Sequence, residues 1–346
     1  MADLKSAIKQ RFASKDMGPI HYILGLKIIR DRKKRLIHIS QPLNALNMLK
    51  QFQLDRARPA TIPLNEVLKA SDSPTEDQTK SEAYAAMHAS YRQGVGSLMY
   101  LMLGTRPDLA YAVQSLSRFL NRPGKKHFGE MKRIMRYVAG TMNYGLLYRG
   151  SDLDLCGYTD PDYAANPDNR RSVSGYCTFV GKCLVSWASQ TQRIVAQSTT
   201  EAEYIALAQA AKDVLFMKTL NCELGNPIKT GSIIRVDNQP AMATACNPVN
   251  HSRTKHIDVR YHFVRERIQL EELKLEYVPS RDNVADLFTK PLVTAVFVPL
   301  REKLGLGLPP VSPSTPTTTT NSAHPSAHQC NSACTSAPAT LRVPAP

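Results

Sequence analysis

The stretch that begins at Ser198 predicts a long α-helix with a carboxylate on its apolar face. Ser198 stands at capping-box spacing from Glu201, and this pair can satisfy N–H groups at the helix start. The pair Thr200 and Glu203 has the same spacing. Helical steps from Glu203 follow an apolar stripe, which consists of Leu207, Ala210 and Val214. Because a buried carboxylate is costly without a partner, Glu203 is expected beside a cation or metal and Glu201 in the cap. The alternative is that Glu203 is an ordinary surface residue.

Extended segments on both sides of this helix predict a mixed α/β sheet. Strand patterns cover 153–159, 172–180, 183–187, 232–236 and 273–277. Helices are expected from Gln239, over 255–270 and from Asn283. Three strands of antiparallel type, a helix and then strand–helix units are typical of a mixed five-stranded sheet with flanking helices.

Three further acidic residues fall where strands end or a helix begins. Asp160 ends the first strand, Asp237 ends the fourth, and Asp286 lies in the first turn of the last helix. If the first and fourth strands are neighbours, Asp160 and Asp237 lie side by side and Glu203 reaches the same place. Such carboxylates repel one another unless divalent cations lie between them, and two Mg²⁺ ions about 4 Å apart suit in-line attack on a phosphodiester. Taken singly, each Asp is more typical of a turn or cap.

Residues 1–150 predict a mostly helical region that contains one β-hairpin. The hairpin spans 20–40, and its charged tip at Asp31–Lys34 either binds a phosphate backbone or is simply solvated. Helices are expected over 1–18, 42–52, 91–103 and 107–120, with a long polar loop over 55–82.

The segment 106–136 is densely basic and interleaved with Tyr111 and Phe119. Its candidate nucleic-acid-binding residues are Arg106, Arg118, Arg122, Lys125, Lys126, Lys132, Arg133 and Arg136. The pattern fits a surface that follows a nucleic-acid backbone, and fits equally well two amphipathic helices with ordinary basic outer faces. The whole chain has 44 basic and 29 acidic residues and a net charge of +15, which favours a phosphate-rich partner.

The remaining composition argues against several classes of protein. No run of about 18 apolar residues occurs, and the N-terminus lacks the apolar core of a signal peptide. The seven cysteines form no regular framework, which suits a reducing compartment. The tail 309–346 is rich in Pro, Ser and Thr and is expected to be disordered. Its residues at zinc-compatible spacing lie in low-complexity sequence that disfavours a metal site, and they are His324, His328, Cys330 and Cys334.

The sequence around the four acidic residues resembles the ribonuclease H domain of copia-type LTR retrotransposon polyproteins. The matching motifs are Tyr-Thr-Asp160, Glu203-Tyr-Ile-Ala, Val-Asp237-Asn-Gln and Asn-Val-Ala-Asp286-Leu-Phe-Thr-Lys. Supporting matches are Ser172-Val-Ser-Gly-Tyr, Trp187-Ala-Ser, Lys255-His-Ile-Asp and Tyr261-His-Phe-Val-Arg. Upstream, Val95-Gly-Ser-Leu-Met-Tyr-Leu and Thr105-Arg-Pro-Asp-Leu-Ala-Tyr-Ala resemble the end of the preceding reverse transcriptase. The resemblance covers about residues 1–300.

The resemblance implies a domain order and an activity. It assigns 1–150 to the end of a reverse transcriptase, 151–292 to a ribonuclease H-like domain, 293–308 to a short helical extension and 309–346 to the tail. Asp160, Glu203, Asp237 and Asp286 would hold two Mg²⁺ ions, with Mn²⁺ as an alternative, for cleavage of RNA in an RNA–DNA hybrid. The partners implied are that hybrid and the rest of the Pol polyprotein, namely reverse transcriptase and integrase, without a membrane. The location implied is a cytoplasmic virus-like particle, with the nucleus as the alternative.

Several residues depart from the family pattern. The loop before Asp286 has no histidine of the kind that aids product release in some members, so His256 and His262 are weaker candidates for that task. Asp162 and Glu201 are alternative ligands to their neighbours. The chain has no Asp-Asp pair, so DNA synthesis by this chain alone is not expected, and a truncated relic that only binds nucleic acid is the competing interpretation.

Overall fold

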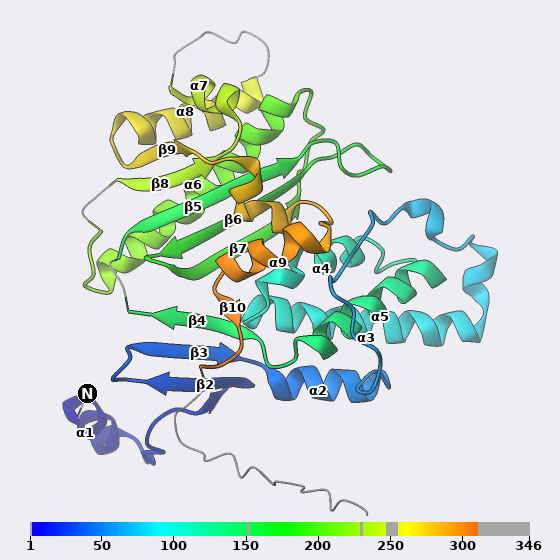
Figure 1. Cartoon of the computed structure of the whole chain (residues 1–346), viewed down its shortest axis with the longest axis horizontal. Coiled ribbons are helices and arrows are strands. Elements are labelled where there is room, and N and C mark those ends of the chain that lie inside the picture. The colour runs from blue at the N-terminus through cyan, green and yellow to red at the C-terminus, as the bar shows by residue number, and fades with distance from the viewer. Residues whose placement is uncertain (1, 151–152, 229–230, 247–254, 311–346) are drawn as a thin grey trace, which may run out of the picture. The chain divides into compact units, whose positions relative to one another are not determined.

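The part of the chain described by the computed structural model contains two five-stranded sheets (Figure 1). The structure describes residues 2–150, 153–228, 231–246 and 255–310. Within these ranges, the side chains of Ala2, Cys246 and residues 255–261 are not described. The tail from residue 311, including its candidate zinc ligands, therefore lies outside the described residues. Among the helices described, none is long and apolar enough to cross a membrane.

The first sheet is antiparallel and has the order β1-β2-β3-β4-β10. Its strands are β1 (Tyr22–Ile23), β2 (Leu26–Asp31), β3 (Leu36–Ser40), β4 (Gly145–Arg149) and β10 (Leu306–Gly307). The predicted hairpin is β2–β3, and it is confirmed. Strands β4 and β10 were not predicted, and they extend the hairpin into a sheet that joins the start and the end of the described chain.

Residues 2–150, which the structure describes, also contain five α-helices (Figure 1). They are α1 (Ala2–Arg11), α2 (Pro42–Gln51), α3 (Glu82–Gly104), α4 (Ala110–Ser117) and α5 (Lys125–Gly140). Three 3₁₀ turns, at Ala70–Asp72, Asp77–Lys80 and Pro107–Leu109, lie between them. Helix α3 begins at Glu82 rather than at Tyr91 because Ser81 caps it: the Ser81 side chain accepts a hydrogen bond from the N–H of Tyr84.

The second sheet has the order β7-β6-β5-β8-β9 and matches the predicted mixed five-stranded sheet. Its strands are β5 (Leu155–Asp162), β6 (Val173–Val180), β7 (Cys183–Thr191), β8 (Ser232–Val236) and β9 (Leu273–Tyr277). Strands β5, β6 and β7 pair antiparallel, whereas β5–β8 and β8–β9 pair parallel. Strands β5 and β8, the first and fourth of this sheet in chain order, are therefore neighbours, as the site prediction requires.

Helix α6 (Thr199–Glu223) crosses one face of the second sheet, together with α7 (Gln239–Cys246) and α8 (Lys255–Gln269). Its predicted apolar stripe is buried against Ile234, Val236 and Leu273. Gly157 of β5 permits this close crossing, since a Cβ there would lie 2.8 Å from Val214 Cγ2.

The other face of the second sheet shares a hydrophobic core with the first half of the chain. Phe179 and Leu184 of this sheet belong to the same buried cluster as Leu116 of α4 and Met131 of α5. After β9 the chain forms a 3₁₀ turn, η5 (Val284–Phe288), and helix α9 (Thr294–Lys303), and both contribute to that cluster. Because the extension ends in β10 beside β4, the first sheet depends on residues from both ends of the described chain.

A buried ion-pair network lies within this shared core. Arg106 donates to both carboxylate oxygens of Asp108 at 2.8 and 3.0 Å, and Tyr137 donates to Asp108 at 2.6 Å. Arg301 of α9 donates to the Tyr137 hydroxyl at 3.2 Å. Arg106 is only 2% exposed, so its prediction as a nucleic-acid contact is wrong: its charge is neutralised inside the protein.

Replacing Asp108 should destabilise the shared core. In Asp108→Asn the buried Arg106 guanidinium loses its counter-ion, and the free energy of unfolding should fall by about 3 kcal/mol in urea titrations. The control is Asp77→Asn, which breaks the exposed pair with Lys80 and should cost at most about 1 kcal/mol. Equal effects of the two substitutions would contradict the structural role of the buried pair.

Candidate active site

Three acidic residues converge where the parallel pair β5–β8 meets the start of α6. Carboxylate oxygens of Asp160, Glu203 and Asp237 all lie within 4.8 Å of one another. Asp160 lies near the end of β5, Asp237 directly follows β8, and Glu203 projects from the first turns of α6. Among the described residues no second group of three His, Cys, Asp or Glu side chains comes together in this way.

The start of α6 fixes the position of Glu203. The Ser198 hydroxyl accepts a hydrogen bond from the N–H of Glu201 at 3.1 Å, and the Glu201 carboxylate accepts one from the N–H of Gln197 at 2.8 Å. Glu201 is therefore engaged in the cap, as predicted, and it is not part of the cluster. Glu203 is 7% exposed, so the alternative of an ordinary surface residue is wrong.

Gln192 also anchors this helix, a role that sequence reasoning missed. Its side-chain amide donates to Ser174 Oγ and to the carbonyl of Ala202, each at 2.9 Å. Glu203 itself accepts a 3.4 Å hydrogen bond from Asn238, whereas its other oxygen, Oε2, has no hydrogen-bond partner among the described residues. A buried carboxylate oxygen without a donor is what a missing cation would leave.

Asp286 lies next to Asp160. It is carried by η5, whose first turn is capped by Asn283, and the Asn283 amide donates to the carbonyl of Thr159 at 3.0 Å. The turn packs against β6 at Gly175, where a Cβ would lie 2.7 Å from Phe288 Cβ. The structure therefore places a fourth carboxylate beside the cluster of three, in a 3₁₀ turn rather than in the expected helix.

Lys290 contacts two of the four carboxylates, those of Asp160 and Asp286. Its ammonium nitrogen lies 3.0 Å from Asp286 Oδ1 and 3.8 Å from Asp160 Oδ2. Thr289 also contacts Asp160, donating a hydrogen bond at 2.5 Å. The spacing of four residues from Asp286 was visible in the sequence, but its significance depends on the position of Asp160, which comes from another element.

Burial makes full ionisation of the cluster unfavourable. Burial, followed by the charges of Asp160 and Asp237, raises the pKa of Glu203 to about 9. Burial and the charge of Asp160 raise the pKa of Asp286 to about 7, and burial raises the pKa of Asp160 against the opposing effect of Lys290. The four donors are all carboxylate oxygens, which suit a hard divalent cation, and the cluster thus fits such an ion in chemistry and charge.

Asp162 and His262, whose side chains are described, lie outside the cluster. Asp162 is half-buried in β5, its pKa is raised by burial, and it is not a member of the group of three. His262 is exposed on α8, in agreement with a role on a helix surface, whereas the side chain of His256 lies outside those described.

The basic segment is partly internal. Helix α5 buries Met131, Ile134 and Met135 and turns its basic residues outward, as the amphipathic alternative predicts. The exposed cations are Arg122, Lys125, Lys126 and Lys132, while Arg133 and Arg136 are half-buried. Lys126 lies 3.3 Å from Glu66 and 3.5 Å from Asp72.

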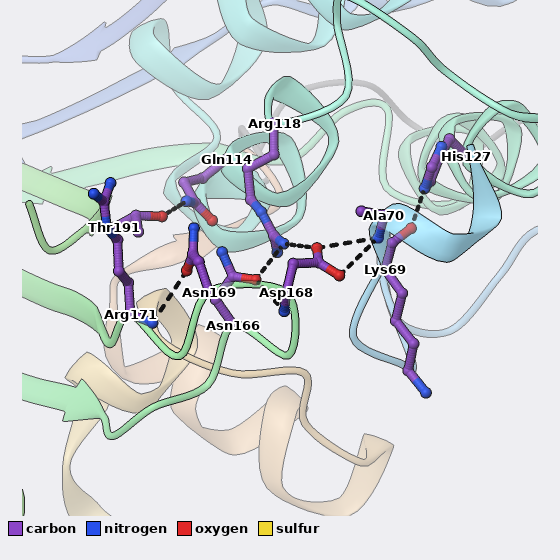
Figure 2. A network of polar contacts seen from close by, with 10 residues as sticks. All are labelled: Lys69, Ala70, Gln114, Arg118, His127, Asn166, Asp168, Asn169, Arg171 and Thr191. Atoms are coloured by element: carbon purple, nitrogen blue, oxygen red, sulfur yellow. Dashed lines mark hydrogen bonds and ion pairs between the residues drawn. The ribbon is translucent and has the colours of Figure 1, made fainter. Parts of the chain in front are cut away.

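Arg118 connects the two halves of the chain (Figure 2). Its guanidinium donates to Asn166 at 2.7 Å and to Asp168 at 2.9 Å, both in the loop between β5 and β6. The same guanidinium lies over the ring of Phe119. The remaining candidates for nucleic-acid contact are therefore the exposed residues of the segment, and their role stays a prediction.

The strand order of the second sheet and the helix that crosses it agree with the mixed five-stranded fold that the resemblance predicts. No protein-family model matches the chain. The chain is 41% identical over 306 residues to the retrovirus-related Pol polyprotein from transposon TNT 1-94 of Nicotiana tabacum, covering 88% of this chain and 23% of that protein. It is 38% identical over 306 residues to the Pol polyprotein from transposon RE1 of Arabidopsis thaliana, covering 88% of this chain and 20% of that protein.

A solved structure of LC11-RNase H1 in complex with an RNA/DNA hybrid shows 17% identity and a TM-score of 0.31, over 39% of this chain and 94% of that one. The chain belongs to the family of retrovirus-related Pol polyproteins of LTR retrotransposons. It spans only about a fifth of the length of these relatives.

The pH dependence of stability tests the electrostatics of the cluster. Because the pKa of Glu203 rises from 4.5 to about 9, the folded protein binds more protons than the unfolded chain between these pH values. The free energy of unfolding of the metal-free protein should therefore fall as pH rises through this window. Urea titrations in EDTA at pH 5.5, 7 and 8.5 measure the slope. Glu203→Gln should flatten it, and a slope unchanged by that substitution would refute the assignment.

Removing Lys290 should expose the repulsion between the carboxylates. Lys290→Met should lower the free energy of unfolding of the metal-free protein by about 2 kcal/mol at pH 8, because Asp160 and Asp286 lose their shared counter-ion. Saturating Mn²⁺ should recover most of this loss. Lys303→Met, which breaks the exposed pair with Asp282, is the control and should cost less than about 1 kcal/mol. An equal loss in both variants, or one that Mn²⁺ does not reduce, would contradict this role.

Proposed function

We propose that the chain is the ribonuclease H region of a copia-type LTR retrotransposon Pol polyprotein and hydrolyses the RNA strand of RNA–DNA hybrids. The observation that carries the proposal is the convergence of Asp160, Glu203 and Asp237 within 4.8 Å, with Asp286 beside them. The family membership supports it, because the relatives are Pol polyproteins of transposons.

The residues present fit two Mg²⁺ ions, with Mn²⁺ as an alternative. Asp160, Glu203, Asp237 and Asp286 would hold them, and the bound ions would supply an activated water and charge stabilisation at the leaving 3′ oxygen. Thr289 and Asn238 orient Asp160 and Glu203, respectively, through the hydrogen bonds described above. Such supporting hydrogen bonds hold ligands in the geometry that a metal requires.

The substrate and partners follow from charge and family. The exposed basic residues on and before α5 suit contact with phosphates of a hybrid, and contacts to 2′-hydroxyl groups would distinguish RNA from DNA. The remaining Pol segments, reverse transcriptase and integrase, are the protein partners proposed, and a cytoplasmic virus-like particle is the proposed location.

Cleavage of a labelled hybrid tests the activity and the site together. The purified chain should cleave the RNA strand with Mg²⁺ and not with EDTA. Asp237→Asn should lower the rate by at least about 100-fold, more than the loss of an outer-shell partner costs. Asp282→Asn, which changes an exposed carboxylate bound to Lys303, is the matched control and should retain the rate.

The outcomes separate an enzyme from a binding protein. Binding of the hybrid without metal-dependent cleavage by the folded chain would refute the nuclease and leave a catalytically inactive relic that binds nucleic acid. Equal rates for Asp237→Asn and the unsubstituted chain would show that the cluster is not the active site.

A further inference from the structure

Asp168 joins three segments at the junction between the two halves of the chain (Figure 2). Its carboxylate accepts hydrogen bonds from the N–H of Ala70 at 2.9 and 3.0 Å, and from Arg118 at 2.9 Å. Its own N–H donates to Asn166, which also accepts from Arg118. The loop between β5 and β6 is thereby fixed to the segment before α3 and to the end of α4.

Further hydrogen bonds stabilise the same junction. Gln114 of α4 donates to the Thr191 hydroxyl at the end of β7 at 2.6 Å. His127 accepts from the N–H of Gly124 through Nδ1, so its Nε2 is the protonated nitrogen and donates to the carbonyl of Lys69 at 3.1 Å. Segments from both halves therefore form one fixed surface.

This surface contains a pocket of about 540 Å³ with an excess of positive charge. Three arginines and one acidic residue line the pocket, namely Arg118, Arg122, Arg171 and Asp168. Their net charge is +2. Arg118 is held by the contacts above, whereas Arg122 and Arg171 are exposed and form no ion pair among the described residues. Two guanidinium groups from different halves of the chain are thus available to an anion.

Neutral donors complete the lining. Asn121 and Asn169 are exposed in the pocket wall. The Asn169 side-chain oxygen accepts a hydrogen bond from the N–H of Arg171 at 3.1 Å, which leaves its NH₂ group to donate. Planar guanidinium groups and amide donors around one concave site match the oxygens of a phosphate.

The pocket lies close to the cluster along the chain. Asn166 follows Asp160 by six residues, so the two are at most about 22 Å apart. Phosphates on one strand of a duplex advance about 3.4 Å per base pair along the axis. A hybrid that presents a phosphodiester to Asp160 therefore has other phosphates within reach of the pocket.

We propose that this pocket binds a backbone phosphate of the RNA–DNA hybrid, with Arg122 and Arg171 as its cationic ligands. The proposal rests on the proposed function, because it takes the hybrid as the ligand. The first half of the chain then supplies part of the nuclease's own substrate-binding surface through Arg122, and Asp168 holds that part in place.

Equilibrium binding without cleavage tests the proposal. Anisotropy of a fluorescein-labelled hybrid is measured in EDTA from 50 to 300 mM KCl for the whole chain and for Arg122→Ala/Arg171→Ala. Loss of two phosphate contacts should reduce the slope of log K against log salt by about 2 and weaken binding at 0.1 M salt by about 60-fold. The double substitution Arg122→Lys/Arg171→Lys keeps the charges and should retain most of the slope.

The control places the same change of charge at the opposite end of the second sheet. Lys182 lies in the β6–β7 turn, and Lys218 lies on α6, 15 residues and so about 22 Å beyond Glu203. Lys182→Ala/Lys218→Ala should leave the slope unchanged. A slope reduced equally by both double substitutions to alanine would overturn the proposal, since it would show only the effect of net charge.

The remaining outcomes separate the pocket from the proposed function. If the unsubstituted chain cleaves the hybrid and Arg122→Ala/Arg171→Ala binds it with the full slope, the pocket proposal fails and the nuclease stands. If the unsubstituted chain neither binds nor cleaves the hybrid, both fail. Inorganic phosphate at constant ionic strength provides the last comparison. If millimolar phosphate raises the melting temperature of the chain but not of the alanine variant, while the hybrid slope is the same in both, the ligand is a free anion and the proposal is wrong.

Discussion

The burial of carboxylates at the end of β5 is the constraint on which the rest of the structure depends. A single buried carboxylate without a cation is expensive, and here Asp160, Glu203 and Asp237 are brought within 4.8 Å. Neighbouring side chains hold these acidic residues close together. Asn238 and Thr289 donate hydrogen bonds to Glu203 and Asp160, and Gln192 anchors the helix that carries Glu203. Unfavourable charges held so firmly support the proposed divalent cation at this cluster.

The two halves of the chain are physically one unit because they share a core. One continuous apolar cluster contains side chains of α3, α4 and α5 as well as of β6, η5 and α9. The closing strand β10 returns to pair with β4, so residues on either side of the second sheet complete the first. The turn that carries Asp286 contacts β5 and β6 as well as α4 and α9. The position of the fourth carboxylate is therefore linked to the packing of the first half of the chain.

The sequence predicted those parts whose cause is local. The ends of β8 and β9 agree with the predicted segments, because alternation and flanking turn residues mark both strands. The cap at Ser198 and the buried stripe of α6 follow from helical spacing alone. The convergence of Asp160, Glu203 and Asp237 was also predictable, since it required only that the first and fourth strands be neighbours.

The missed features depend on partners distant in sequence. Strand β10 has two residues, and its conformation depends on β4, 160 residues earlier in the register that pairs Leu146 with Leu306. The burial of Arg106 was missed because a basic residue in a basic segment gives no sign of its surroundings, although its partner Asp108 stands only two positions away. Lys290 illustrates the same limit: it stands four positions after Asp286, whereas its contact with Asp160 depends on the whole fold.

Lys290 also shows how the site can remain folded before a divalent ion binds. A lysine on a short turn provides one positive charge to two carboxylates, Asp160 and Asp286. Its side chain is 37% exposed, so the ammonium group can move to solvent without unfolding the turn. Asp160, Glu203 and Asp237 would hold a divalent cation, which would supply more positive charge than the lysine does. The lysine thus limits the repulsion in the metal-free protein without blocking the site permanently.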